Sequence, residues 1–198
     1  MSKAVMLSIR PKWCEKIANG EKTIEVRKTR PKLETPFKCY IYCTMPDAKD
    51  PHNILELHGA DGKIRKANGK VIGEFTCDRI QSFDSAYSKW AYAVAPSGSV
   101  MPMHETKALE LCQKDGCLSD DDVLSYFGDE DWKAYFWHIA DLRIYDTPRE
   151  LSEFRRATDP CDSCHAEYTW ECKDCKKLGG DIKRPPQSWC YVEAMKDE

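Results

Sequence analysis

The sequence lacks any apolar run close to the roughly 20 residues that a bilayer-spanning helix needs, which argues against a helical membrane protein. Its first residues, MSKAVMLSIRPKW, contain no apolar stretch of signal-peptide length, so we expect the chain to stay in the cytosol. Internal repeats and low-complexity linkers are also missing. With 198 residues, the chain is expected to form a single domain over residues 1–198.

Charge is present but unevenly distributed. Charged residues make up 32% and aromatic residues 11% of the chain, a composition too rich in core-forming side chains for disorder. The net charge is −3, yet nine Lys or Arg residues stand against three Glu residues through Lys32, so the remainder carries −9. A basic N-terminal face on an acidic body favours a polyanionic partner, although a solvated charged face gives the same pattern.

The cysteines suggest a metal site. Their number is odd, 11, and no signal peptide is evident, so reduced thiols or metal ligands are expected. The segment CDSCHAEYTWECKDC has the spacing C-x2-C-x7-C-x2-C, and four thiolates suit tetrahedral Zn²⁺ with a structural role. We predict a zinc-knuckle insertion over residues 155–183. His165 could replace one sulfur, and a disulfide or free thiols remain alternatives. The predicted ligands are Cys161, Cys164, Cys172 and Cys175.

Local patterns predict a mixed α+β, barrel-like fold with strands at both ends. Expected strands cover residues 4–9, 22–28, 37–44, 138–146 and 188–194, and Asn68-Gly69 predicts a hairpin between two more. Three helices are expected: one from Pro11 to Gly20, one over residues 105–114, and one from the N-cap Ser119 to Gly128. A fourth is expected to begin in TPRELSEF, where Thr147, Pro148 and Glu150 suggest a capping box.

The first candidate site lies near the N-terminus. In the strand over residues 22–28, the period-two pattern places Glu25 and Arg27 on one face, opposite Ile24 and Val26. An exposed ion pair explains this pattern. A nucleotide-binding patch explains it equally well, with cations for phosphate, a ring for base stacking and a carboxylate for base edges. The patch would comprise Arg10, Lys12, Trp13, Lys22, Glu25 and Arg27.

A second candidate segment, RPPQSW, precedes the last predicted strand. It is most simply a proline-rich loop with Trp189 in the core. If it lies beside the first patch in a closed barrel, it adds an aromatic wall and an amide that can read a base. The residues concerned are Gln187, Ser188 and Trp189, together with Arg184.

The segment SIRPKWCEKIANGEKTIEVRK resembles the signature of the ASCH domain family, G-x-K-x-x-E-x-R, filled here by Gly20, Lys22, Glu25 and Arg27. The segments HIADLRIYDTPRELSEF and RPPQSWCYVE resemble the C-terminal half of phage and prophage members. The resemblance implies a small PUA-like β-barrel with flanking helices, related to RNA-binding domains. It places Lys22, Glu25 and Arg27 in the cleft.

The resemblance also bears on chemistry. Some compact ASCH proteins are amidohydrolases acting on an acetylated cytidine through a lysine, a threonine and a glutamate, and another is a ribonuclease. Lys22 matches the lysine, but Glu25 occupies the threonine position, and Thr23 lies two residues too early. Binding of RNA or a modified nucleotide, with DNA possible, is the leading hypothesis. A hydrolase using Lys22 and Glu25 as acid and base, and an adaptor for a host protein, are the alternatives.

Overall fold

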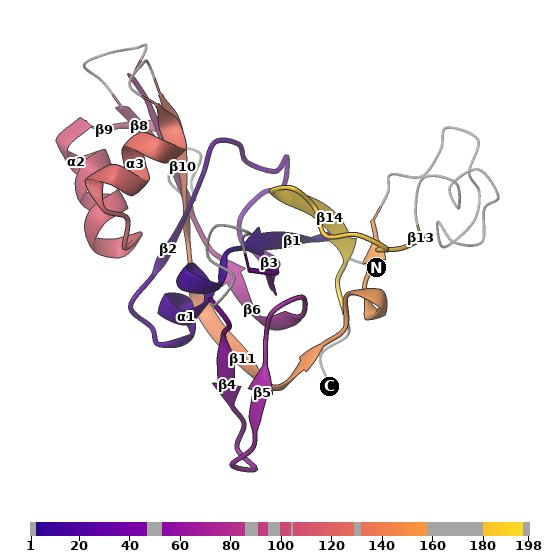
Figure 1. The fold of residues 1–198 in the computed structure, drawn as a ribbon. Helices are drawn as coiled ribbons and strands as arrows, with labels where there is room; N and C mark the ends of the chain where they lie inside the picture. The colour runs from indigo at the N-terminus through magenta and orange to yellow at the C-terminus, as the bar shows by residue number, and fades with distance from the viewer. Residues whose placement is uncertain are drawn as a thin grey trace, which may run out of the picture. The chain divides into compact units, whose positions relative to one another are not determined.

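The protein is described from a computed structural model (Figure 1). The chain divides into two compact units, each assembled from segments far apart in the sequence. The first unit comprises Met1–Cys14, Lys38–Phe75 and Arg143–Glu198, and the second comprises Glu15–Phe37 and Thr76–Leu142. The single domain expected over residues 1–198 stays a prediction. The structure describes residues 3–46, 53–85, 91–94, 100–103, 105–128, 132–157 and 180–195.

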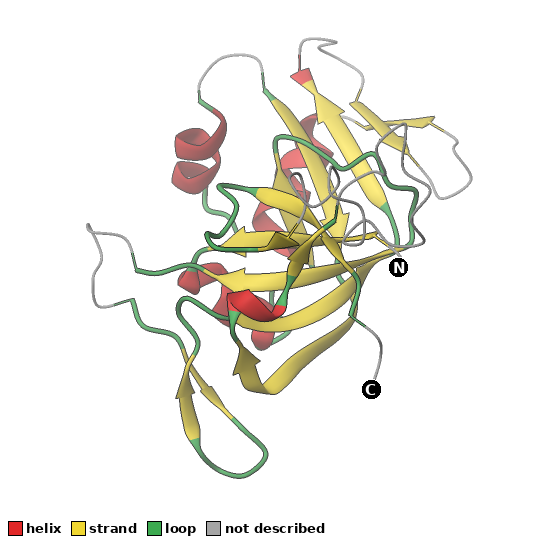
Figure 2. Cartoon of the chain, turned by 90° about the vertical axis from the view of Figure 1, so that its right-hand side faces the viewer, coloured by secondary structure: helices red, strands yellow, loops and turns green. Residues whose placement is uncertain are grey.

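A seven-stranded sheet, largely in the first unit, confirms the predicted mixed α+β class, and strands dominate the drawn elements (Figure 2). The predicted N-terminal strand is β1 (Lys3–Ile9), which pairs in parallel with β3 (Phe37–Cys43) and antiparallel with β14 (Trp189–Glu193). The order is β11-β6-β3-β1-β14-β12-β13. The remaining bounds are β6 (Val71–Cys77), β11 (Ala140–Arg149), β12 (Arg155–Arg156) and β13 (Gly180–Asp181).

One hydrophobic core lies within the first unit. Phe154 is 1% exposed and packs edge-to-face on Tyr40, with ring centroids 4.9 Å apart. Burial of such apolar surface is the main driving force for folding. The buried cluster comprises Ala4, Met6, Tyr40, Tyr42, Val71, Phe154, Ile182, Cys190 and Val192.

The second unit contains a five-stranded sheet. Its order is β2-β10-β7-β8-β9, so the strand that carries Glu25 and Arg27 lies at one edge. In the antiparallel pair of β2 and β10, Glu25 lies opposite Trp137 and Arg27 opposite Tyr135. The bounds are β2 (Ile24–Arg27), β7 (Ile80–Asp84), β8 (Ala91–Val94), β9 (Val100–Met103) and β10 (Lys133–His138).

Helices in the second unit pack on Ile24 and Val26. The predicted helix over residues 105–114 is α2 (Glu105–Glu110) followed by a π-helical turn, η2 (Leu111–Asp115). The next helix, α3 (Asp120–Phe127), begins and ends as predicted, with a capping box between Ser119 and Asp122. The buried cluster comprises Ile24, Val26, Phe83, Ala108, Leu111, Cys112, Val123, Ala134 and Phe136.

The helix predicted to begin at Thr147 is wrong. Thr147 and Pro148 continue strand β11 to Arg149, and only a three-residue 3₁₀ turn, η3 (Leu151–Glu153), follows. A capping box exists, but it joins Glu150 to Glu153. Because β11 ends the order of the seven-stranded sheet, Pro148 lies on an edge strand, where its missing N–H is tolerated.

Two short paired strands flank the predicted zinc insertion. Arg155 of β12 lies opposite Asp181 of β13, and Arg156 lies opposite Gly180. The four predicted cysteine ligands and His165 lie between these strands, outside the described residues. The described strands of the larger sheet run from β11 to β13 as an open order, so the predicted closed barrel is not shown for this part of the chain.

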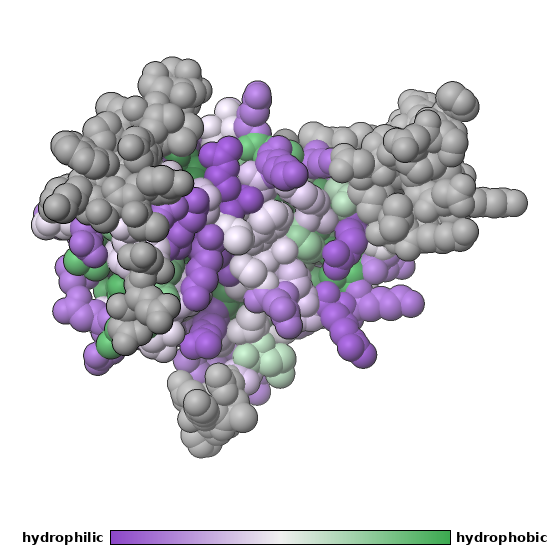
Figure 3. Space-filling model, turned by 90° about the horizontal axis from the view of Figure 1, so that it is seen from above, coloured by the Kyte–Doolittle hydropathy of each residue, from purple (hydrophilic) through white to green (hydrophobic). Residues whose placement is uncertain are grey.

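Hydrophilic residues cover much of the described surface on the face seen in Figure 3, with hydrophobic residues in small groups between them. No helix in the described ranges is long and apolar enough to cross a membrane. Among exposed apolar side chains, Leu124 and Tyr126 lie on helix α3 of the second unit.

The hairpin predicted around Asn68-Gly69 is also wrong. The strand before it, β5 (Ile64–Lys66), pairs with β4 (Glu56–His58), whereas β6 after it joins the larger sheet. Asn68 instead joins loops: its Oδ1 accepts a hydrogen bond from the Leu55 amide at 2.9 Å, and its Nδ2 donates to the Thr44 carbonyl at 3.2 Å. The turn forms, with Gly69 at φ +78°, but it connects different sheets.

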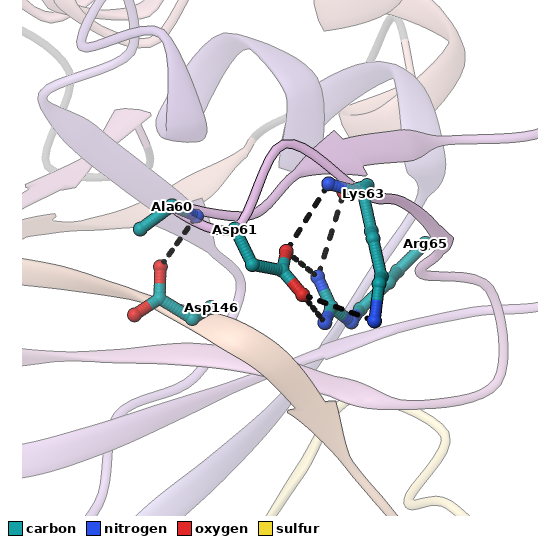
Figure 4. A network of polar contacts seen from close by, with 5 residues as sticks. All are labelled: Ala60, Asp61, Lys63, Arg65 and Asp146. Carbon is teal, nitrogen blue, oxygen red and sulfur yellow. Dashed lines mark hydrogen bonds and ion pairs between the residues drawn. The ribbon is translucent and has the colours of Figure 1, made fainter.

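The true β4–β5 hairpin is held by a polar network (Figure 4). Arg65 donates two hydrogen bonds to the Asp61 carboxylate, at 2.8 and 2.7 Å. These bonds lower the pKa of Asp61 to about 2. The Ala60 amide donates to Asp146 of β11 at 3.1 Å, which ties the hairpin turn to the edge of the seven-stranded sheet.

Candidate functional site

Three residues of the predicted signature meet in the second unit. The helix α1 (Pro11–Ala18) ends before Gly20, which adopts φ +75°, and the Lys22 amide donates to the Lys16 carbonyl at 3.0 Å. Glycine suits this left-handed conformation because it has no Cβ. The turn places Lys22 immediately before β2, which carries Glu25 and Arg27.

Lys22, Glu25 and Arg27 form one buried charge network. Glu25 Oε1 lies 2.8 Å from Arg27 Nε, and its Oε2 lies 3.5 Å from Lys22 Nζ. The three residues are 3%, 6% and 7% exposed. All four residues of β2 are buried, so the alternative of a solvent-exposed Glu25–Arg27 pair is wrong.

The π-helical turn supplies a fourth partner, which the sequence pattern did not indicate. Lys22 Nζ donates to the Gly116 carbonyl at 2.7 Å, and the Thr23 amide donates to the Asp115 carbonyl at 2.9 Å. These contacts satisfy carbonyls that the end of a helix leaves without intrahelical donors. A π-helical turn is rare and often occurs at functional sites. Gly116 is tightly enclosed, since a Cβ there would lie 2.6 Å from the Cys112 carbonyl.

Burial changes the acid–base behaviour of this cluster. It lowers the pKa of Lys22, because removing water disfavours the ammonium form, although the Glu25 carboxylate opposes this shift. Burial likewise raises the pKa of the Cys112 thiol to about 11, opposed by Lys22. Lys22 and Arg27 thus both pair with the Glu25 carboxylate in a nearly dry site.

Two further residues border the network. Cys117 adopts a positive φ of 54°, and its Sγ donates to the Glu21 carbonyl at 3.4 Å. Tyr126 is 37% exposed; burial raises the pKa of its phenol, the Arg27 charge opposes this rise and the Glu25 charge adds to it. Neither was predicted, because sequence spacing does not relate residues 117 or 126 to the signature. Thr23, by contrast, is exposed, unlike Glu25.

The remaining predicted nucleotide contacts lie in the first unit. Arg10 and Lys12 are exposed, and Lys12 Nζ lies 4.3 Å from the centroid of the Trp13 ring. Because β1 and β14 are antiparallel with Leu7 opposite Trp189, the end of β1 and the start of β14 coincide. Ser8 binds this second segment, with its amide 2.9 Å from the Ser188 carbonyl.

Arg10, Lys12 and Trp13 therefore occupy the same end of the β1–β14 pair as Gln187, Ser188 and Trp189. Gln187 is exposed, while Ser188 and Trp189 are half-buried. Trp189 packs edge-to-face on Tyr191, with centroids 5.4 Å apart, so it is only partly a core residue. Within the first unit, the structure thus brings together the two groups of residues that the sequence analysis treated separately.

Comparison with known proteins places this geometry in a family. The ASCH domain model matches residues 7–178. Crystal structures of ASCH from Zymomonas mobilis are similar at 17% identity. The native structure has a TM-score of 0.54 and covers 96% of this chain and 87% of that one. The structure of a tyrosine-to-phenylalanine variant has a TM-score of 0.52, and the match covers 97% of this chain and 91% of that chain. No curated protein matches. The family match spans the buried Lys22–Glu25–Arg27 network, and the chain belongs to the ASCH domain family.

Proposed function

We propose that this protein binds RNA or a modified nucleotide, and that the buried Lys22–Glu25–Arg27 network forms the base of the binding site. The observation that carries the proposal is the burial of a lysine, a glutamate and an arginine in one ion-pair network. Burying charges costs free energy that apolar side chains would not cost, so such networks often mark functional sites.

Exposed groups in each unit provide the chemistry for RNA. Lys28, Arg30 and Lys32 are exposed and follow β2 directly. In the first unit, Arg10 and Lys12 offer cations, Trp13 and Trp189 offer rings, and the Gln187 amide can pair with a base edge. This proposal includes the subtype that the sequence resemblance implies, a PUA-like ASCH protein of the phage or prophage type.

Binding to single-stranded RNA is expected to weaken steeply with added salt. Each neutralised phosphate releases condensed counterions, so the logarithm of the association constant falls by about 0.7 per contact for each tenfold rise in salt. Fluorescence anisotropy of a labelled oligonucleotide, titrated at several salt concentrations, measures this slope. A DNA oligonucleotide of the same sequence reports on discrimination at the 2′-hydroxyl.

Binding that is absent, or that does not respond to salt, would contradict the proposal. Hydrolysis is the second candidate function, because buried Lys22 has a lowered pKa and lies beside Glu25. The same samples distinguish binding from hydrolysis. Chromatography of RNA and of an acylated cytidine after incubation would show turnover. If turnover occurs and is lost in a folded Glu25→Gln variant, the protein is a hydrolase rather than a binding protein.

We also propose that Cys161, Cys164, Cys172 and Cys175 hold a structural zinc ion. Four thiolates in two C-x2-C pairs fit the soft, tetrahedral preference of Zn²⁺. Pairing of β12 with β13 supports an inserted segment between residues 155 and 183, because it brings the two ends of that segment together. Elemental analysis of freshly purified protein is expected to give one zinc per chain, and protein without zinc would contradict this.

A further inference from the structure

Helix α3 carries an exposed tyrosine at the end of a continuous series of aromatic contacts. The Tyr126 ring packs edge-to-face on Phe127, with centroids 4.8 Å apart, and Phe127 contacts Trp132 at 4.8 Å. Trp132 in turn contacts Phe83 at 4.4 Å, and Phe83 is 4% exposed. Tyr126 is itself 37% exposed. The hydrophobic core therefore fixes the position of an aromatic ring that reaches solvent.

A lysine lies over the same rings. Lys28 is exposed, and its Nζ lies 5.1 Å from the Tyr126 centroid and 5.9 Å from the Phe127 centroid. Both distances are within the range of cation–π attraction. For the part of the chain that is described, no carboxylate forms an ion pair with Lys28.

The position of this pair links it to the signature network. Lys28, which lies over the Tyr126 ring, directly follows Arg27, and the charges of Arg27 and Glu25 both act on the pKa of the Tyr126 phenol. Acidic residues of α3 lie at its other end: Asp120, Asp121 and Asp122 occupy the first turn, whereas Tyr126 occupies the last. An anionic ligand at Tyr126 would therefore meet Lys28 rather than these carboxylates.

We propose that Tyr126 stacks on an unpaired base of single-stranded RNA while Lys28 contacts an adjacent phosphate. The inference rests on the proposed function and specifies its ligand. Stacking on aromatic rings is the usual way in which proteins hold unpaired bases, and it requires a ring fixed at the surface. A duplex keeps its bases stacked internally, so it would not use this platform.

The test measures the affinity of the full-length protein for a fluorescein-labelled oligouridylate. Tyr126→Ala is expected to weaken binding about 5- to 100-fold, the effect of losing one stacked base. Tyr126→Phe keeps the ring and should bind within about twofold of the unchanged protein. Lys28→Ala should weaken binding and reduce the salt slope by about 0.7.

Leu124→Ala is the matched control, because Leu124 lies on the same helix and is 54% exposed. It removes exposed apolar surface without removing a ring, so RNA affinity should not change. Thermal unfolding of each variant, followed by circular dichroism, confirms that α3 is intact. A Tyr126→Ala effect that Leu124→Ala shares would indicate a general loss of surface packing and would overturn the proposal.

The other outcomes are separable. If the unchanged protein binds no RNA, the proposed function fails, and this inference fails with it. If it binds RNA but Tyr126→Ala binds equally well, only the stacking platform is overturned. Equal losses in Tyr126→Phe and Tyr126→Ala would assign the effect to the hydroxyl and overturn stacking. Equal affinity for single-stranded and duplex RNA would overturn the requirement for an unpaired base.

Discussion

Glu25→Ala is expected to lower the free energy of unfolding by about 3–5 kcal/mol, because it removes a carboxylate that pairs with two buried cations. Glu25 lies 2.8 Å from Arg27 and 3.5 Å from Lys22, and the three side chains are 2–8% exposed. Water therefore cannot replace the missing carboxylate without opening the site. Urea denaturation followed by circular dichroism measures the loss.

Glu21→Ala is a matched control four residues earlier. Glu21 also pairs with a lysine, Lys16, at 2.9 Å, but its side chain is 52% exposed. Solvent screens such a pair, so removing it should leave stability nearly unchanged. If Glu21→Ala and Glu25→Ala were equally destabilising, burial would not be the cause, and the importance of the network for stability would be disproved.

Stability is expected to rise with pH in a way that depends on Lys22. Its pKa is lowered in the folded state by burial, from an ordinary value of 10.5. Between the lowered pKa and 10.5, the unfolded chain binds a proton that the folded chain does not. The free energy of unfolding should therefore increase with pH in this window, by at most about 1.4 kcal/mol per pH unit for one group.

A Lys22→Met variant isolates this effect, because methionine has similar length and no titrating group. The difference in the free energy of unfolding between the unchanged protein and the variant should grow with rising pH once the pH exceeds the lowered pKa of Lys22. The comparison stays below the ordinary thiol pKa of 9.0, because buried Cys77 and Cys112 have raised pKa values and act in the opposite direction above it. A difference that does not change with pH would show that Lys22 stays charged when buried.

Local signals in the sequence were sufficient to predict several helix ends. Ser119 caps α3 and Gly128 follows its last turn, because a hydroxyl that accepts from a backbone amide and a glycine at positive φ act within one turn. Pro11 begins α1 for the same kind of reason, since it fixes a helical φ where no amide donor is needed.

Strand partners were not predictable in this way. Asn68-Gly69 forms a turn, but the flanking strands join different sheets, and Thr147 remains in a strand despite a helix-capping pattern. In both cases the sheet supplies hydrogen bonds from residues distant in sequence. These long-range hydrogen bonds outweigh the local preference, and a pattern of a few residues contains no information about them.

The candidate site was partly predictable. The signature indicated Lys22, Glu25 and Arg27, and period-two patterning placed Glu25 and Arg27 on one face. The pattern could not show that this face is buried, because alternation along a strand does not say what packs on each face, and all four residues of β2 are buried. It also could not indicate Gly116, which lies 94 positions from Lys22, or Tyr126, whose ring lies 5.1 Å from Lys28 Nζ at the end of β2.

The placement of β1 has a consequence for the order in which the chain folds. This first strand lies inside the seven-stranded sheet, between β3 and β14, and Lys3 pairs with Glu193. When only the first half of the chain has been synthesised, β1 and β3 are present, but β14, which pairs with the other edge of β1, is not. Closure of such a long loop is slow. The exposed edge of β1 is then a site at which nascent chains are expected to need chaperones until residue 193 emerges.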